Sequence, residues 1–200
     1  TDDALVTVTN SLPTITSIDV TPDTGVTTST ELTCTVSASD PDDSRTPTIL
    51  YEWLDAAGNN IGTSSTLRLT SSISSPGDTI TCKATAFDTD GGTADATDSV
   101  TVDNSNPYLT KVEITPDSGV TTSTKLTCSG TAFDPDGGTP TITYEWSQNT
   151  TFVGTGGTLE LDNSTYSPGD KIVCTAKATD ADGGHGTLSD SVTISNTDPV

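Results

Sequence analysis

Methionine is absent from the 200 residues, and aromatic residues make up only 4 % of them. Basic side chains are also scarce, because seven Lys and Arg stand against 28 Asp and Glu, for a formal net charge of -21. Seven cations cannot hold a phosphate backbone against this excess of anions, so a nucleic-acid-binding surface is excluded. No segment approaches the roughly 18 consecutive apolar residues of a transmembrane helix, and we predict no membrane span.

Helical periodicity is lacking as well, and period-2 alternation takes its place. Apolar residues alternate with Thr and Ser, a pattern typical of β-strands that bury one face. In the first half of the sequence these segments are residues 32–38, 49–53, 67–69, 80–86 and 100–102. In the second half they are residues 126–128, 142–146, 159–161, 172–176 and 192–194. Turn-forming Pro, Gly, Asn and Asp lie between them. The pattern predicts an all-β protein with about seven short strands in each half.

The two halves of the sequence repeat each other. Residues 21–30 recur as residues 115–124, an offset of 94, and the Tyr-Glu-Trp tripeptide at residues 51–53 recurs at residues 144–146, an offset of 93. A period of this length is too long for a solenoid repeat and suits a domain that folds independently. The sequence therefore predicts two tandem domains.

The ends of the sequence continue the same repeat. Residues 6–13 resemble residues 100–107 and 192–199, since each stretch pairs a Val-Thr strand with a linker that ends in Pro. The predicted boundaries are 1–9 for the terminal strand of a preceding repeat or a donor strand, 10–103 and 104–195 for the two domains, and 196–200 for the start of the next linker. We expect the chain to belong to a longer head-to-tail array. The alternative is that its ends fall without regard to the strands.

Each repeat also contains a Cys, a Trp and a second Cys in this order. The residues are Cys34, Trp53 and Cys82 in the first repeat, and Cys128, Trp146 and Cys174 in the second. This pattern resembles immunoglobulin-like (Ig-like) domains, in which the first Cys lies on strand B, the Trp on strand C and the second Cys on strand F. The Asp-Pro-Asp-Gly-Gly loop and the Tyr-Glu-Trp strand also resemble PKD-like repeats of large secreted bacterial or archaeal surface proteins. One departure is that Ile80 and Ile172 replace the tyrosine of the family's tyrosine corner.

The resemblance implies two tandem Ig-like β-sandwich domains with one disulfide each, Cys34–Cys82 and Cys128–Cys174, packed against a core Trp. Disulfides persist in oxidising compartments, so an extracellular or cell-surface location is expected. The alternative is a zinc site built from the four thiolates, but no Cys-x-x-Cys pair is present to form one.

Acidic Asp-x-Asp loops are the sharpest chemical signal. In Ig-like domains the loops after strands B and F emerge at the end that also receives the incoming linker, so we expect their side chains to gather there. Clustered carboxylates with a following Gly can supply the oxygen ligands of Ca²⁺. The alternative is plain turn chemistry, with Asp capping the turn and Gly supplying a positive φ. The candidate calcium ligands are Asp40, Asp42, Asp43, Asp88, Asp90, Asp103, Asn104, Asp134, Asp136, Asp180 and Asp182.

A catalytic constellation is missing from the sequence. His185 is the only histidine, and no Gly-x-Ser-x-Gly motif accompanies it. Glu52 and Glu145 lie beside the Trp of each repeat, but alternation directs them away from the core. Asn149-Thr150-Thr151 and Asn163-Ser164-Thr165 match the N-glycosylation sequon, a match that chance makes frequent in a Thr-rich chain.

We therefore predict a structural, non-enzymatic module of an extracellular stalk, fibre or filament. Its partners would be neighbouring copies of the same repeat or subunit, with strand exchange between subunits through residues 4–9. The alternative function is an adhesin or a carbohydrate-binding accessory module with a glycan or surface ligand. Calcium is the only cofactor that the sequence indicates.

Overall fold

The structure is a computed structural model that describes residues 8–196. The predicted strand at residues 1–9 and the predicted linker at residues 196–200 lie almost wholly outside the described residues. Every regular element of residues 8–196 is a β-strand, and this part of the chain has no helix that could cross a membrane. The chain divides into two compact units, Thr1–Asn104 and Ser105–Val200. The sequence repeat places the division one residue earlier, between residues 103 and 104.

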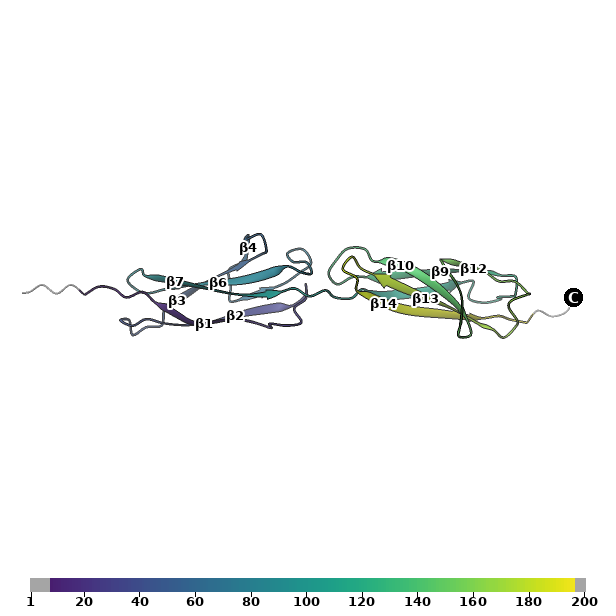
Figure 1. The fold of residues 1–200 in the computed structure, drawn as a ribbon, viewed down its shortest axis with the longest axis horizontal. Helices are drawn as coiled ribbons and strands as arrows, with labels where there is room; N and C mark the ends of the chain where they lie inside the picture. The colour runs from purple at the N-terminus through teal and green to yellow at the C-terminus, as the bar shows by residue number, and fades with distance from the viewer. Residues whose placement is uncertain (1–7, 197–200) are drawn as a thin grey trace, which may run out of the picture. The chain divides into compact units, whose positions relative to one another are not determined.

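Unit 1 is an antiparallel sandwich of two sheets (Figure 1). The three-stranded sheet has the order β1-β2-β5 and consists of β1 (Thr14–Thr21), β2 (Glu31–Ser39) and β5 (Thr66–Arg68). The four-stranded sheet has the order β4-β3-β6-β7 and consists of β3 (Thr48–Leu54), β4 (Asn60–Gly62), β6 (Thr79–Phe87) and β7 (Thr93–Thr101).

Unit 2 repeats this topology strand for strand. Its three-stranded sheet has the order β12-β9-β8 and consists of β8 (Tyr108–Thr115), β9 (Lys125–Phe133) and β12 (Thr158–Glu160). Its four-stranded sheet has the order β11-β10-β13-β14 and consists of β10 (Thr141–Gln148), β11 (Thr151–Thr155), β13 (Lys171–Thr179) and β14 (His185–Thr193). Both units are Ig-like sandwiches with seven strands each among the described residues.

A tryptophan and a disulfide form the centre of each core. Trp53 and Trp146 are fully buried, and their ring N–H groups donate to the carbonyls of Ser64 and Gly156, each at 2.8 Å. In unit 1 the Cys34–Cys82 disulfide connects β2 to β6 and so joins the two sheets, and Cys128–Cys174 does the same in unit 2. With sequence separations of 48 and 46 residues, each bridge stabilises its unit by about 4 kcal/mol in the chain-entropy model.

Alternation of apolar residues does not reveal β1 and β8. Both strands contain a register shift, between Ile15 and Ser17 in β1 and between Leu109 and Lys111 in β8. A bulge moves the later residues to the opposite face, so the buried positions on its two sides no longer alternate in phase. Apolar alternation in the sequence also does not reveal the first halves of β7 and β14. Their inward positions hold small or polar residues such as Ala94.

A carboxylate bridges the two sheets along one edge of each sandwich. In unit 1 the backbone N–H of Val20 on β1 donates to Asp98 Oδ2 on β7 at 2.8 Å. In unit 2 Ile114 on β8 donates to Asp190 Oδ2 on β14, also at 2.8 Å. Val20 and Ile114 are buried, so water cannot readily replace these acceptors. The carboxylates therefore satisfy edge N–H groups that neither sheet pairs.

We expect Asp98→Ala to lower the free energy of unfolding of unit 1 by about 1–3 kcal/mol, because it leaves the Val20 N–H buried without an acceptor. Asp190→Ala should do the same to unit 2. Asp98→Asn is the control, since its amide oxygen can still accept the bond and most of the loss should be recovered. Denaturant unfolding measures these differences. Equal stability of the Ala and Asn variants would contradict the assignment.

Candidate functional site

The predicted acidic loops lie at one end of each unit, where the preceding chain segment enters. We call this end the acidic pole. In unit 1 it consists of the loop that follows β2 and the loop that joins β6 to β7, and in unit 2 of the loops that follow β9 and β13. Its carboxylates are Asp40, Asp42, Asp43, Asp88 and Asp90 in unit 1, and Asp134, Asp136, Asp180 and Asp182 in unit 2.

In unit 1 the acidic pole binds the incoming linker. The Ser11 backbone N–H donates to Asp42 Oδ2 at 2.8 Å, and the Asn10 side-chain amide donates to Asp88 Oδ2 at 2.9 Å. The two loops are also connected to each other, because the Thr89 hydroxyl donates to Asp43 Oδ2 at 2.8 Å. One linker is thus attached to both loops at once.

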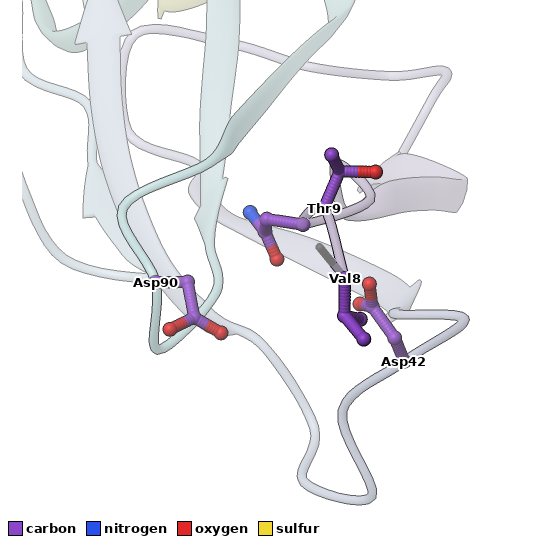
Figure 2. A pocket seen from close by; sticks show the side chains of 5 residues that line it. Val8, Thr9, Asp42 and Asp90 are labelled. Carbon is purple, nitrogen blue, oxygen red and sulfur yellow. The ribbon is translucent and has the colours of Figure 1, made fainter. Parts of the chain in front are cut away.

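Figure 2 shows the hollow that remains at this pole in unit 1. Val8 and Thr9 extend beside Asp42, and Asp90 lies on the opposite loop. The hollow measures about 320 Å³ and is also lined by Asn10. Two of its five lining residues are acidic, so it repels anionic molecules.

Each loop is held in shape by its own first aspartate. Asp88 Oδ1 accepts the N–H groups of Asp90 and Gly92, at 2.9 and 2.7 Å. Asp40 Oδ1 accepts the N–H groups of Asp42 and Asp43, each at 3.0 Å. These are Asx-turns, which is the turn chemistry that the sequence indicated as the alternative to calcium.

Hydrogen bonds also set the pKa values at this pole. The Asn10 amide, followed by backbone N–H groups, lowers the pKa of Asp88. The side chains of Asp40 and Asp42 lie side by side and interact. This raises the pKa of Asp40 and lowers that of Asp42, which the Ser11 N–H lowers further. When both are ionised, the buried Asp40 Oδ2 accepts no hydrogen bond from residues 8–196. The Ser11 N–H that attaches the linker thus favours the ionised form of Asp42.

Gly92 permits the close approach of the linker. A Cβ atom at this position would overlap Asp88 Oδ2 and come within 2.9 Å of Leu12 Cδ2 and 3.0 Å of Asn10 Nδ2. Since Asp88 and Asn10 are themselves hydrogen-bonded, any side chain at position 92 would separate the loop from the linker. The second Gly of the Asp-x-Asp-Gly-Gly loop is therefore explained by packing.

Unit 2 repeats, 94 residues later, the bond between the linker Ser and the loop Asp. The Ser105 N–H donates to Asp136 Oδ2, as Ser11 does to Asp42. Asp134, which is only 8 % exposed, accepts the Asp136 N–H at 3.0 Å. Asp180 Oδ1 accepts the N–H groups of Asp182 and Gly184, at 2.9 and 2.8 Å. The hydrogen bond between the linker Ser and the loop Asp is thus present in both units.

The opposite end of each unit holds the outgoing chain. The Asp103 N–H donates to the Val26 carbonyl at 2.6 Å in unit 1, and the Ser195 N–H donates to the Val120 carbonyl at 2.7 Å in unit 2. Asp103, a predicted calcium ligand, is therefore attached by its backbone to the end of unit 1 that lies opposite its acidic pole. Asn104 follows it as the last residue of unit 1.

The carboxylates of the acidic poles are the predicted calcium ligands. Within residues 8–196 no group of three or more His, Cys, Asp or Glu side chains is placed to hold a metal ion. Ca²⁺ requires six to eight oxygens at about 2.3–2.6 Å, whereas Asp42 and Asp88 each direct an oxygen at the linker. Calcium binding stays a prediction of the sequence.

The side chains considered for catalysis were His185, Glu52 and Glu145. His185 is exposed at the start of β14 and pairs with Thr179. Glu52 lies on the outer face of its sheet, 3.4 Å from the Lys83 ammonium, and Glu145 is exposed. Sequence reasoning did not identify Ser11, Ser105, Asp98 or Asp190 as hydrogen-bonding partners. The recurrence of Asn-Ser at residues 10–11 and 104–105 was the signal for the first two.

No protein-family model matches the sequence, and no curated protein matches it. Among solved structures, the three N-terminal domains of the bacteriophage RB49 Hoc protein match 92 % of the chain at 18 % identity, with a TM-score of 0.33. The chain spans 59 % of that structure. Sidekick-1 immunoglobulin domains 1–5 match 95 % of the chain and 40 % of their own length, at 19 % identity and a TM-score of 0.39. The fibronectin(III)-like modules of Clostridium thermocellum CbhA match 88 % of the chain and 94 % of their own length, at 19 % identity and a TM-score of 0.33. The Ig-like fold of this chain follows from its own strand order, disulfides and buried tryptophans.

We expect Asp42→Ala to remove one of the two hydrogen bonds that attach the linker to unit 1, while Asn10 stays bound to Asp88. The Ser11 amide should then exchange with solvent about tenfold faster or more, because a charge-assisted hydrogen bond is lost. Asp136→Ala should act in the same way on Ser105. Asp90→Ala is the matched control, since it removes a charge from the same pole without removing a linker bond. Hydrogen exchange at single amides measures the effect, and unchanged exchange at Ser11 in Asp42→Ala would contradict it.

Acid should destabilise both units. The pKa values of Asp42 and Asp88 are lowered in the fold, so the stability that they contribute is present above the ordinary value of 3.8 and is lost as the pH falls through the folded values. The raised pKa of Asp40 acts in the opposite direction. Accepted hydrogen bonds also lower the pKa values of Asp43, Asp55, Asp162 and Asp170.

Because the lowered values outnumber the raised one, the denaturant midpoint should fall steadily below about pH 4. Urea titrations at neutral pH and at successively lower pH measure this. A midpoint that stays constant down to about pH 3 would show that these hydrogen bonds do not depend on ionisation.

The calcium prediction can be tested on the same protein. If the acidic poles are turns that hold the linker, the melting temperature should be the same in excess Ca²⁺ and in excess chelator. A melting temperature that falls with chelator and returns when Ca²⁺ is restored would establish the metal site instead. Mg²⁺ at the same ionic strength controls for simple charge screening.

Proposed function

We propose that the chain is a structural, non-enzymatic module of an extracellular array in which Ig-like units follow one another head to tail. The observation that carries the proposal is the repeated linker bond, Ser11 to Asp42 and Ser105 to Asp136. Each unit carries its own acceptor for the segment that enters it. A unit built in this way can be added in series any number of times, because the junction needs nothing from outside the repeat.

The extracellular location is supported by the disulfides. All four cysteines are paired, and such bonds form and persist outside reducing compartments. The charge is consistent with this use, because a chain with a net charge of -21 stays soluble at high local concentration. Both features suit a spacer in a stalk, fibre or filament.

Strand exchange between subunits, which the sequence indicated, would take a particular form. Both units already contain the strand that pairs with the second Cys-bearing strand, since β7 pairs with β6 and β14 pairs with β13 over nine residues each. A strand donated by a neighbouring copy would therefore add to a sheet edge instead of filling a gap.

A second candidate function is binding of a glycan or surface ligand. It is favoured by Tyr108 and Phe133, whose rings lie 5.5 Å apart on paired positions of β8 and β9 and are 50 % and 52 % exposed. Unit 1 has Thr14 and Ser39 as the corresponding pair, so this feature is not part of the repeat. Exposed aromatic pairs offer apolar faces to sugars and proteins. A glycan array that is blank for the wild type would argue against this function.

Electron microscopy of the native material tests the array. Rods with an axial repeat of one or two units are expected, because the junctions recur with the units. Purified chain at high concentration serves as the comparison, since it shows whether assembly requires covalent continuity. Native material that consists only of separate globular particles would contradict the proposal.

A further inference from the structure

Unit 2 contains both N-glycosylation sequons of the sequence, at Asn149 and Asn163. We propose that Asn163 carries an N-linked glycan and that Asn149 does not. The argument rests on how the fold uses the two Asn side chains. The inference requires an extracytoplasmic chain, as the proposed function does, but it does not require an array.

The Asn149 side chain makes hydrogen bonds that hold its turn in place. Asn149 occupies the turn between β10 and β11 with a left-handed backbone, φ 57°. Its side-chain oxygen accepts the Lys171 N–H at 3.0 Å, and its side-chain nitrogen donates to Asp170 Oδ1 at 3.2 Å. Its own N–H donates to the Lys171 carbonyl at 2.7 Å. A glycan on its side-chain nitrogen would have to be accommodated against the Asp170 carboxylate.

The Asn163 side chain makes no such hydrogen bonds within the described residues. It is exposed in the turn that follows β12, and its carboxamide makes no hydrogen bond to any residue of the described chain. Asp162 organises the turn instead. Its carbonyl accepts the Tyr166 N–H at 3.0 Å, and its Oδ1 accepts the N–H groups of Ser164 and Thr165 at 2.9 and 3.0 Å.

Unit 1 shows that this turn does not need an asparagine. The same turn recurs there, with the Thr70 carbonyl accepting the N–H groups of Ile73 and Ser74 at 3.0 and 3.1 Å. Ser71 occupies the position that corresponds to Asn163. The fold therefore gives no reason for an Asn at position 163, whereas it gives a full account of Asn149.

The modification is a glycosyl transfer from a lipid-pyrophosphate-linked oligosaccharide. The Asn163 side-chain nitrogen would form a bond to C1 of the first sugar, while the bond between C1 and the phosphate oxygen breaks. The lipid pyrophosphate leaves with the electron pair, and the amide loses one proton to a base of the transferase. The +2 residue Thr165 completes the sequon.

A glycan at Asn163 would protect an edge strand of unit 2. Asn163 lies three residues after the end of β12, which is the short edge strand of its sheet. A hydrated glycan at this place would obstruct the addition of a foreign strand to that edge, as charged residues and prolines do elsewhere.

Peptide mapping by mass spectrometry of the native protein tests the proposal. The peptide with Asn163 is expected to carry a glycan, and an amide-cleaving glycosidase should convert the residue to Asp. The peptide with Asn149 is expected at its unmodified mass. An unmodified Asn163 in the native protein, or a glycan on Asn149, would overturn the proposal.

Variants secreted from a cell that performs N-glycosylation provide the second measurement. Asn163→Gln and Thr165→Ala should each lose the whole glycan mass, and Asn149→Gln should keep it. Asn163→Gln should retain the melting temperature of the enzymatically deglycosylated wild type, because its side chain makes no contact that the fold needs. A glycan that remains in Asn163→Gln would contradict the assignment.

Discussion

The hydrogen bond from a backbone N–H to an aspartate carboxylate is the interaction on which this structure depends. With 28 acidic and seven basic residues, most carboxylates cannot be paired with cations. They accept N–H groups instead, which gives a stronger hydrogen bond than a neutral acceptor would. Asp98 uses this bond to join the two sheets, Asp88 to shape a loop and Asp42 to hold the linker. The same kind of hydrogen bond, from a backbone N–H to an Asp carboxylate, thus joins the sheets, shapes the turns and attaches the linker.

A modest apolar core makes these bonds necessary. Only 30 % of the residues are apolar, and the outward positions of the strands are mostly Thr and Ser. Burial around Trp53 or Trp146 is therefore supplemented by a disulfide that restricts the unfolded chain. Small secreted domains commonly rely on this combination. The carboxylate bonds then satisfy the polar backbone groups that such a thin core leaves near its boundary.

The sequence predicts the fold well because the fold repeats. Cys34, Trp53 and Cys82 define three strands and the inter-sheet bridge, and their second occurrence removes ambiguity. The bulged strands β1 and β8 are harder to predict from the sequence, because a single extra residue changes the phase of the alternation. The role of the acidic loops is still harder to predict from the sequence. Asp-x-Asp followed by Gly fits both an Asx-turn and a calcium loop, and only the position of Ser11 beside Asp42 reveals which partner the carboxylate has.

The edges of the two three-stranded sheets are poorly suited to pairing with another sheet. β5 and β12 are three residues long, and β1 and β8 have an inward N–H occupied by Asp98 and Asp190. Short and blocked edges discourage pairing with another sheet. Negative charge adds repulsion between neighbouring chains at low salt and less at high salt. By contrast, each acidic pole accepts the backbone N–H of an uncharged linker residue, Ser11 or Ser105, which is covalently present at a high effective concentration. Within each unit, the covalently attached linker is therefore the partner that the acidic pole binds.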